Sequence, residues 1–124
     1  MSPNYEPLRV LSLSKDFVEK VYFVIQRRPF EREASLRNQM KRAAISISSN
    51  IAEGDGRGYS KEGIRFFKIA IASAEEVKSQ LEFSAKIGLV SQGESQELCE
   101  QCSVICRMLN KLIQSRLNRK NHLE

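Results

Sequence analysis

The residues best suited to chemistry in this chain are basic side chains near the ends of helical segments. Between Gln101 and Leu123 there is no acidic residue, and the bases of this stretch are Arg107, Lys111, Arg116, Arg119 and Lys120. A second set begins within a glycine-rich segment at 54–58 and continues after it, and it consists of Arg57, Lys61, Arg65 and Lys68. Clustered cations attract the phosphate groups of a nucleic acid, and binding releases the counterions that had condensed on those phosphates. These residues therefore predict contact with a nucleic-acid backbone.

A ligand-free explanation of the same bases stays open. Glu94, Glu97 and Glu100 lie upstream of the bases in the same segment, and acids before bases is the order that the helix dipole favours. The whole chain carries 20 bases and 15 acids, a formal charge of +5. This balance favours an anionic partner only mildly.

A further basic group is expected at the opposite end of the molecule. Glu31 and Glu33 partly offset its charge, and its members are Arg27, Arg28, Arg32, Arg37, Lys41 and Arg42. The group could face solvent, a neighbouring subunit or a second nucleic-acid segment, and the sequence leaves these three alternatives open.

The cysteines and the histidine do not form a metal-binding or catalytic pattern. Cys99, Cys102 and Cys106 are spaced i, i+3 and i+7, which places them on one face of a helix. A zinc site needs a fourth ligand, and the one histidine, His122, stands almost at the chain end. We expect buried thiols, no metal and no cofactor.

Other candidate catalytic groups are also weak. The glycine-rich segment at 54–58 resembles a phosphate-binding loop, but it follows a helical segment rather than a strand. We expect an interhelical turn there, with an anion site made by Arg57 and the next helix N-terminus as the alternative. Glu75 and Glu76 are adjacent and point in different directions. We therefore predict that the chain is not an enzyme.

The elements that position these residues are helices. Leu, Ile, Ala, Glu, Lys, Arg, Gln and Ser dominate the 124 residues, and the apolar residues recur every three or four positions. We expect one domain over 1–124, with helices at about 11–28, 35–53, 61–87 and 92–117. Pro29, Gly54 and Gly88 are the expected stops, while Ser35, Ser60 and the Ser91–Glu94 pair are the expected starts. Short connections predict an antiparallel, all-α four-helix bundle.

Two of these helices lack a clear polar face. No charged residue occurs from Ala43 to Ala52, and the segment from Ile64 to Ala74 is apolar around most of its circumference. A helix of a small monomer normally has a polar stripe. We therefore expect a second surface, such as another copy of the chain, to cover these helices.

Asn50, Glu53 and Gly54 combine polar groups with a helix end. The amide of Asn50 must find a partner, because an unpaired buried polar group costs about 1–3 kcal/mol. We interpret Asn50 and Glu53 as structural, with ligand contact as the alternative, and expect Arg57 or Arg65 to pair with the carboxylates of Glu53 and Asp55.

Three cysteines, no signal peptide and no membrane span favour the cytoplasm.

These residues carry a family resemblance over about residues 8–115. The chain resembles the bacterial four-helix proteins encoded in intervening sequences of 23S ribosomal RNA. The matching residues are Gln39-Met40-Lys41-Arg42-Ala43-Ala44-Ile45-Ser46-Ile47, Ser49-Asn50-Ile51-Ala52-Glu53-Gly54, Arg57, Glu62, Arg65-Phe66-Phe67, Ile69-Ala70 and Ala72-Ser73. Ser48 stands where the family usually has proline.

The resemblance implies a ring-like homopentamer of four-helix bundles, in which five chains at +5 give a formal +25. It also implies a relation in fold to the accessory protein of diversity-generating retroelements, which binds nucleic acid and a reverse transcriptase. Two functional hypotheses follow. The first is a nucleic-acid-binding protein for RNA or an RNA/DNA hybrid, and the second is a protein-interaction scaffold that assists a reverse transcriptase.

Overall fold

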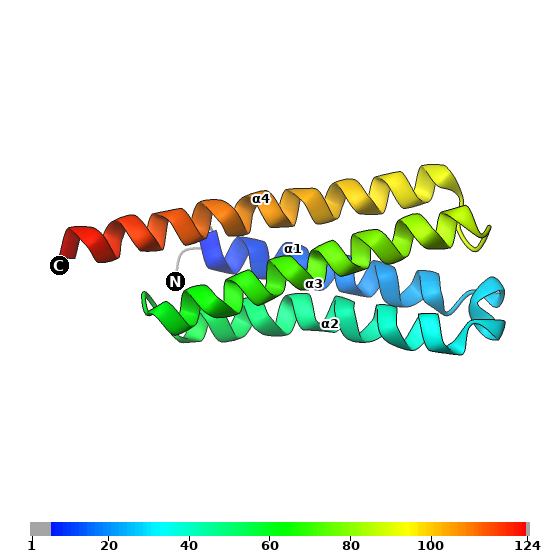
Figure 1. Cartoon of the computed structure of the whole chain (residues 1–124), viewed down its shortest axis with the longest axis horizontal. Helices are drawn as coiled ribbons and strands as arrows, with labels where there is room; N and C mark the ends of the chain where they lie inside the picture. Colours follow the sequence, from blue (N-terminus) through cyan, green and yellow to red (C-terminus); the bar gives the residue numbers. More distant parts are fainter. Residues whose placement is uncertain (1–5, 124) are drawn as a thin grey trace.

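The chain forms four long α-helices and one short 3-10 helix. The computed structural model describes residues 6–123, with the side chains of 6, 8 and 120–123 outside that description. The helices are α1 (Glu6–Ile25), η1 (Arg28–Arg32), α2 (Ala34–Gly56), α3 (Lys61–Lys86) and α4 (Gln92–Leu123), and residues 6–123 contain no strand. Figure 1 shows the four long helices lying roughly along one axis, with successive helices antiparallel. The predicted all-α four-helix fold is confirmed.

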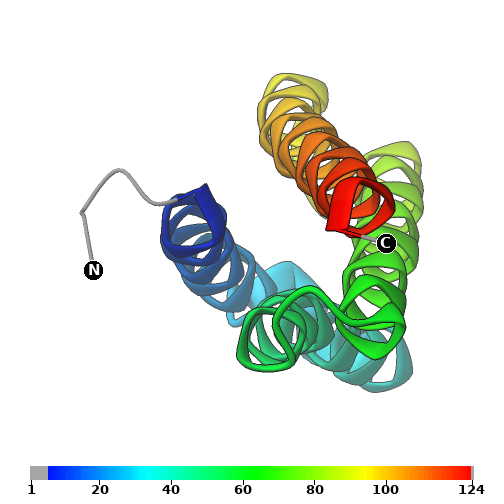
Figure 2. The same cartoon turned by 90° about the vertical axis from the view of Figure 1, so that its left-hand side faces the viewer.

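The helices pack in sequence order around a single core. The contacts are most extensive between α2 and α3, followed by α3 with α4 and α1 with α2, and α1 packs on α4 least. Viewed from one end in Figure 2, α1 and α4 stand apart while α2 and α3 lie together. The predicted seams form the core, in which Phe17, Met40, Ile47, Phe67 and Leu109 are at most 1% exposed.

Two helix starts and one helix end agree with their sequence signals. Ser60 precedes α3, and its Oγ accepts a hydrogen bond from the backbone N–H of Gly63 at 3.0 Å. The Oγ of Ser91 accepts from the N–H of Glu94 at 3.1 Å, as half of a capping box would. Past the end of α3, Gly88 has a φ of 84°, a left-handed conformation that glycine adopts without strain.

The capping and stop signals expected for α2, Ser35 and Gly54, are both wrong, although the helix begins within one residue of the expected start. The helix begins at Ala34 with Glu33 as its N-cap, and the hydroxyl of Ser35 instead accepts a bond from the Gln39 side chain at 3.2 Å. At the other end α2 continues through Gly54 to Gly56, and the left-handed residue of the turn is Gly58, with a φ of 63°. The other departures are that α1 begins and ends earlier than expected, and that α4 continues past residue 117.

Gly54 is required by close packing instead of by helix termination. A Cβ placed on Gly54 would lie 2.5 Å from a ring carbon of Phe67 and 2.9 Å from the carbonyl oxygen of Gly63. A Cβ on Gly63 would lie 2.7 Å from the carbonyl oxygen of Gly58. The two glycines therefore let the end of α2 and the start of α3 approach more closely than side chains would permit.

Polar side chains in the middle of α2 tie it to α3. Asn50 Nδ2 donates to the carbonyl oxygen of Ser46 at 2.8 Å and to Ser46 Oγ at 2.9 Å. Ser46 Oγ in turn lies 2.8 Å from Ser73 Oγ on α3. The amide of Asn50 is thus satisfied inside the chain, which agrees with a structural role.

No helix within residues 6–123 is both long and apolar enough to cross a membrane.

Candidate nucleic-acid interface

The C-terminal part of α4 and the turn between α2 and α3 meet at one end of the bundle, which we call the basic pole. The contact is made by Arg116, whose Nη1 donates to the carbonyl oxygens of Gly54, at 3.0 Å, and of Gly58. Its Nη2 lies 3.5 Å from a carboxylate oxygen of Asp55. Figure 1 shows α4 extending past this turn. The two basic groups found in the sequence are therefore neighbours, as antiparallel packing requires.

Arg116 itself is not a surface residue, and its prediction as a nucleic-acid contact is corrected. Its relative exposure is 1%, and its guanidinium lies 4.6 Å from the ring centroid of Phe67. The last carbonyl groups of a helix lack helical partners and carry the negative end of the helix dipole. Arg116 donates to the carbonyl oxygen of Gly54, near the end of α2, and to that of Gly58 in the following turn, so its charge holds the pole together and is unavailable to phosphate.

Five other predicted bases are exposed at or near this end. Among residues 6–119, none of them pairs with an acidic side chain. They are Lys61, Arg65, Lys68, Lys111 and Arg119. Free cations of this kind keep their full charge for an anionic ligand.

Three of these bases form a row on α3. Lys61, Arg65 and Lys68 are spaced i, i+4 and i+7 and span about 10 Å of helix. Glu75, seven residues after Lys68, accepts a bond from Cys106 on α4 at 3.8 Å. Residues seven apart lie on nearly the same side of a helix. The row therefore runs along the edge of α3 that borders α4.

The remaining predicted contacts differ from this group. Arg57 lies between two acids, 3.6 Å from Glu53 and 3.2 Å from Glu62, so its charge is largely compensated. Arg65, the other expected partner of the acids at the end of α2, pairs with neither Glu53 nor Asp55. Arg107 lies in the middle of α4, and its guanidinium is 3.3 Å from the carboxylate of Glu100. Glu100 is the nearer of the two to the opposite pole. Lys120 belongs to α4, but its side chain lies outside the described residues, as does that of His122.

Two aromatic residues at the pole were not identified as site residues from the sequence. Tyr59, in the turn before α3, is 41% exposed, and its ring centroid lies 4.7 Å from the guanidinium of Arg119 and 5.1 Å from that of Arg116. Phe66 lies 5.4 Å from the guanidinium of Arg57. The available signal was an aromatic residue inside a glycine-rich turn, but its basic neighbours come from the far end of the chain.

The opposite pole carries the second basic group. The guanidinium of Arg27 makes two short contacts to the carboxylate of Glu94, at 2.6 and 2.9 Å, and this hydrogen bond raises the pKa of Arg27. The pair joins the end of α1 to the start of α4. Arg28, Arg32 and Arg42 are exposed and, within the described part of the chain, have no acidic partner.

The cysteines line the contact between α4 and α3. Cys102 and Cys106 are buried and Cys99 is half-buried. Burial raises the pKa of Cys102 to about 12, with smaller effects from the Cys106 and Cys99 thiols and Glu75, and burial together with Glu75 raises that of Cys106 to about 11. No cluster of metal-ligating side chains occurs among the residues that the structure describes. The thiols act as small apolar side chains with weak hydrogen-bond donors.

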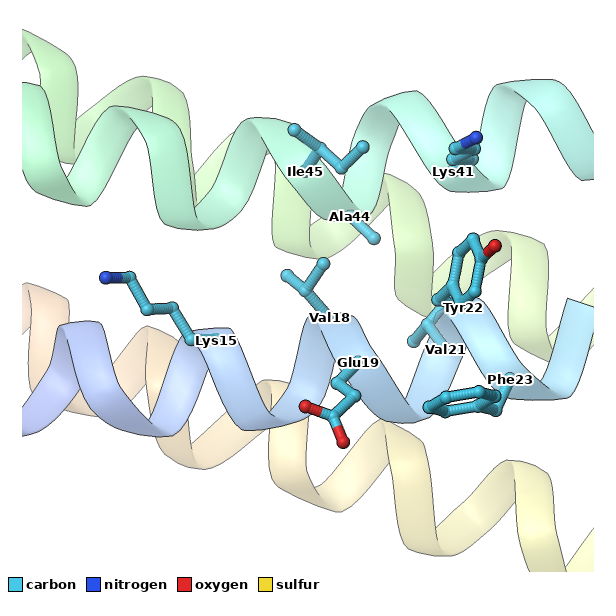
Figure 3. Close-up of a pocket in the computed structure, with 9 residues that line it drawn as sticks. All are labelled: Lys15, Val18, Glu19, Val21, Tyr22, Phe23, Lys41, Ala44 and Ile45. Atoms are coloured by element: carbon cyan, nitrogen blue, oxygen red, sulfur yellow. The ribbon is translucent and has the colours of Figure 1, made fainter.

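A separate apolar groove lies between α1 and α2. It has a volume of about 490 Å³, and Figure 3 shows Val18 of α1 opposite Ala44 and Ile45 of α2, with Tyr22 beside Lys41. Tyr22, Ile45 and Phe23 remain 41%, 45% and 61% exposed. Large apolar side chains this exposed are typical of a surface that another molecule covers.

The fold and the pole together define a basic, all-α four-helix bundle with a cationic end. The model of the family described as 23S rRNA-intervening sequence protein matches residues 6–111. The chain therefore belongs to this family, and the resemblance read from its motifs is confirmed.

Solved structures show the same fold. One of them is a protein of unknown function from the S23 ribosomal protein family of Bacteroides thetaiotaomicron, which is 19% identical to this chain with a TM-score of 0.76. The match covers 89% of this chain and 99% of that protein. No curated protein matches this chain.

Proposed function

We propose that this chain binds RNA, or an RNA/DNA hybrid, through the basic pole and without catalysing a reaction. The observation that carries the proposal is the row of free cations on α3, Lys61, Arg65 and Lys68, beside the exposed Arg119 of α4. Phosphate contacts position a nucleic acid without reading its sequence. Binding should therefore depend on charge and shape, with weak sequence selectivity.

We also propose that the protein is a homopentamer. The family resemblance supports the number of subunits, and the exposed apolar side chains of the α1–α2 groove supply a surface that a neighbouring subunit would cover. In a ring, each pole is repeated five times, so a modest cationic patch becomes multivalent and its avidity rises.

The RNA-binding proposal is tested by removing charge at one pole at a time. The triple variant Lys61→Gln, Arg65→Gln, Lys68→Gln should weaken binding of a fluorescent RNA hairpin at least about tenfold in an anisotropy titration, because it removes three free cations per subunit. The matched control is Arg28→Gln, Arg32→Gln, Arg42→Gln, which removes the same charge from the opposite pole. Equal losses in the two variants would show that only net charge matters and would reject the basic pole as the site.

The α1–α2 groove also supports the second candidate function, a scaffold for a protein partner such as a reverse transcriptase. The two candidates differ in what covers the groove. If another copy covers it, Phe23→Glu lowers the mass of the assembly. If a partner protein covers it, the variant keeps the mass and loses the partner.

A further inference from the structure

Tyr59 places an exposed aromatic ring at the basic pole, next to the cations. The ring is 41% exposed, and it contacts the guanidinium groups of both Arg116 and Arg119. Arg116 also packs on the ring of Phe67, which is fully buried. The side chains therefore form a continuous series of cation–π contacts that starts in the core at Phe67 and reaches the surface at Tyr59 and Arg119.

Backbone contacts that do not involve the Tyr59 ring hold the turn that carries this residue. Arg116 is 1% exposed and holds the turn through the carbonyl oxygens of Gly54 and Gly58. On the other side of Tyr59, Ser60 Oγ donates to the carbonyl oxygen of Arg57 at 2.9 Å and accepts from the N–H of Gly63 at 3.0 Å, so the backbone is held both before and after the tyrosine. A ring that is ordered before binding loses little conformational entropy when a ligand packs on it.

The chemistry next to Tyr59 matches an unpaired nucleotide. Nucleobases stack on tyrosine rings and on arginine planes, and Arg119 has no acidic partner among residues 6–119. Lys61 follows Tyr59 by two residues and begins the α3 row, whose length of about 10 Å corresponds to roughly three nucleotides of one strand. A base and its phosphates would thus meet an aromatic surface and a line of cations together.

We propose that Tyr59 and Arg119 form a stacking site for an unpaired base of the nucleic acid whose backbone follows Lys61, Arg65 and Lys68. This inference rests on the proposed function and makes it more specific. Bases inside a duplex are covered by their neighbours, so the ligand must offer a single-stranded end, loop or bulge at this pole.

The experiment compares three RNA hairpins with the same stem and a loop of abasic nucleotides: one blunt, one with a short single-stranded overhang, and one with an overhang of equal length made of abasic nucleotides. The last carries the phosphates without the bases. The wild-type protein should bind the hairpin with the normal overhang about fivefold or more tightly than the abasic one, which is the scale of one base stacked on an aromatic side chain. Equal binding of these two RNAs by the wild type would overturn the proposal without any variant.

The variants assign the preference to the ring. Tyr59→Ala should abolish the preference for the normal overhang, and Tyr59→Phe should keep it. Tyr22→Ala is the matched control, because Tyr22 is equally exposed and also has a cation, Lys41, 5.6 Å from its ring centroid, but lies in the α1–α2 groove. A preference that survives in Tyr59→Ala would contradict the assignment.

The blunt hairpin separates this inference from the proposed function. Failure of the proposed function would appear as blunt-hairpin binding that the Lys61, Arg65 and Lys68 triple variant does not weaken. Failure of the stacking site alone would appear as normal loss in that triple variant, together with identical affinities for the normal and abasic overhangs.

Discussion

At the scale of single residues, Arg116 shows how a base can serve the fold instead of a ligand. It stands in a stretch without acids, where the sequence alone groups it with four other cations. The structure buries it against the end of α2, where it satisfies two carbonyl groups and contacts Asp55. The distinction matters because a charge-removing variant at Arg116 would reduce RNA binding by damaging the pole, and would give misleading support to a direct contact.

Arg116→Ala should therefore destabilise the protein by about 2–4 kcal/mol, since it removes charged hydrogen bonds to the carbonyl oxygens of Gly54 and Gly58 and the ion pair with Asp55. The measurement is urea unfolding followed by circular dichroism. Arg119→Ala is the control and should change the unfolding free energy by less than about 0.5 kcal/mol, because Arg119 is exposed. Equal unfolding midpoints for the two variants would contradict the capping role of Arg116.

Cys102 makes a pH-dependent contribution to stability. Its pKa is raised to about 12 in the folded chain, against 9.0 for an ordinary thiol, so the unfolded chain loses this proton first. The contribution is complete below about pH 9 and is lost as the pH rises toward about 12, with a slope of up to about 1.4 kcal/mol per pH unit. Cys102→Ser, which does not titrate in this range, should show a flatter decline in urea unfolding above pH 9. Parallel declines for the two proteins would exclude the effect.

At the scale of elements, the α2–α3 crossing explains the family motif. Asn50 bonds within α2, Ser46 reaches Ser73, and Gly54 lies against Phe67, so the motif residues mainly fix how two helices pack. These contacts indicate a structural role for the motif. They do not indicate a ligand site.

Gly54→Ala should cost about 1–3 kcal/mol of unfolding free energy, because the new methyl group would overlap the ring of Phe67. Gly56→Ala is the matched control two residues later, where a Cβ meets nothing within 4 Å. That change should be neutral or stabilising by up to about 1 kcal/mol, since alanine favours the helix more than glycine. Thermal or urea unfolding measures the two free energies. A neutral Gly54→Ala would show that α2 and α3 tolerate a wider separation at their crossing.

The helices and core seams were predictable because they follow from periodicity in neighbouring residues. The core positions Met40, Ile47 and Leu109 could be assigned from spacing alone. The end of α2 could not, because Gly54 looks like a helix stop until Phe67, thirteen residues later, is placed against it. The site was only partly predictable for the same reason: the row on α3 is local in sequence, whereas the burial of Arg116 and the pairing of Tyr59 with Arg119 depend on contacts between distant segments.

At the scale of the whole molecule, the exposed groove predicts self-association. Light scattering should give a mass near five times the 14.2 kDa of one chain. Phe23→Glu should lower this mass, because it places a charge in the face that we expect a neighbouring subunit to cover. Phe83→Glu is the control, with a comparably exposed phenylalanine on α3 at 51%, and should leave the mass unchanged. A wild-type protein of single-chain mass at micromolar concentration would refute the assembly.

In the proposed pentamer, one basic pole from each subunit would contribute to a single multivalent particle. The proposed function depends most on whether Lys61, Arg65 and Lys68 of α3 contact phosphates directly. The measurement that tests it is the salt dependence of hairpin binding for the wild type and for the Lys61, Arg65 and Lys68 triple variant. If about four phosphates are neutralised, the wild-type affinity should fall roughly a hundredfold from about 50 to about 200 mM salt, and the triple variant should show a much shallower slope. Identical slopes for the two proteins, or an affinity that hardly changes with salt, would contradict it.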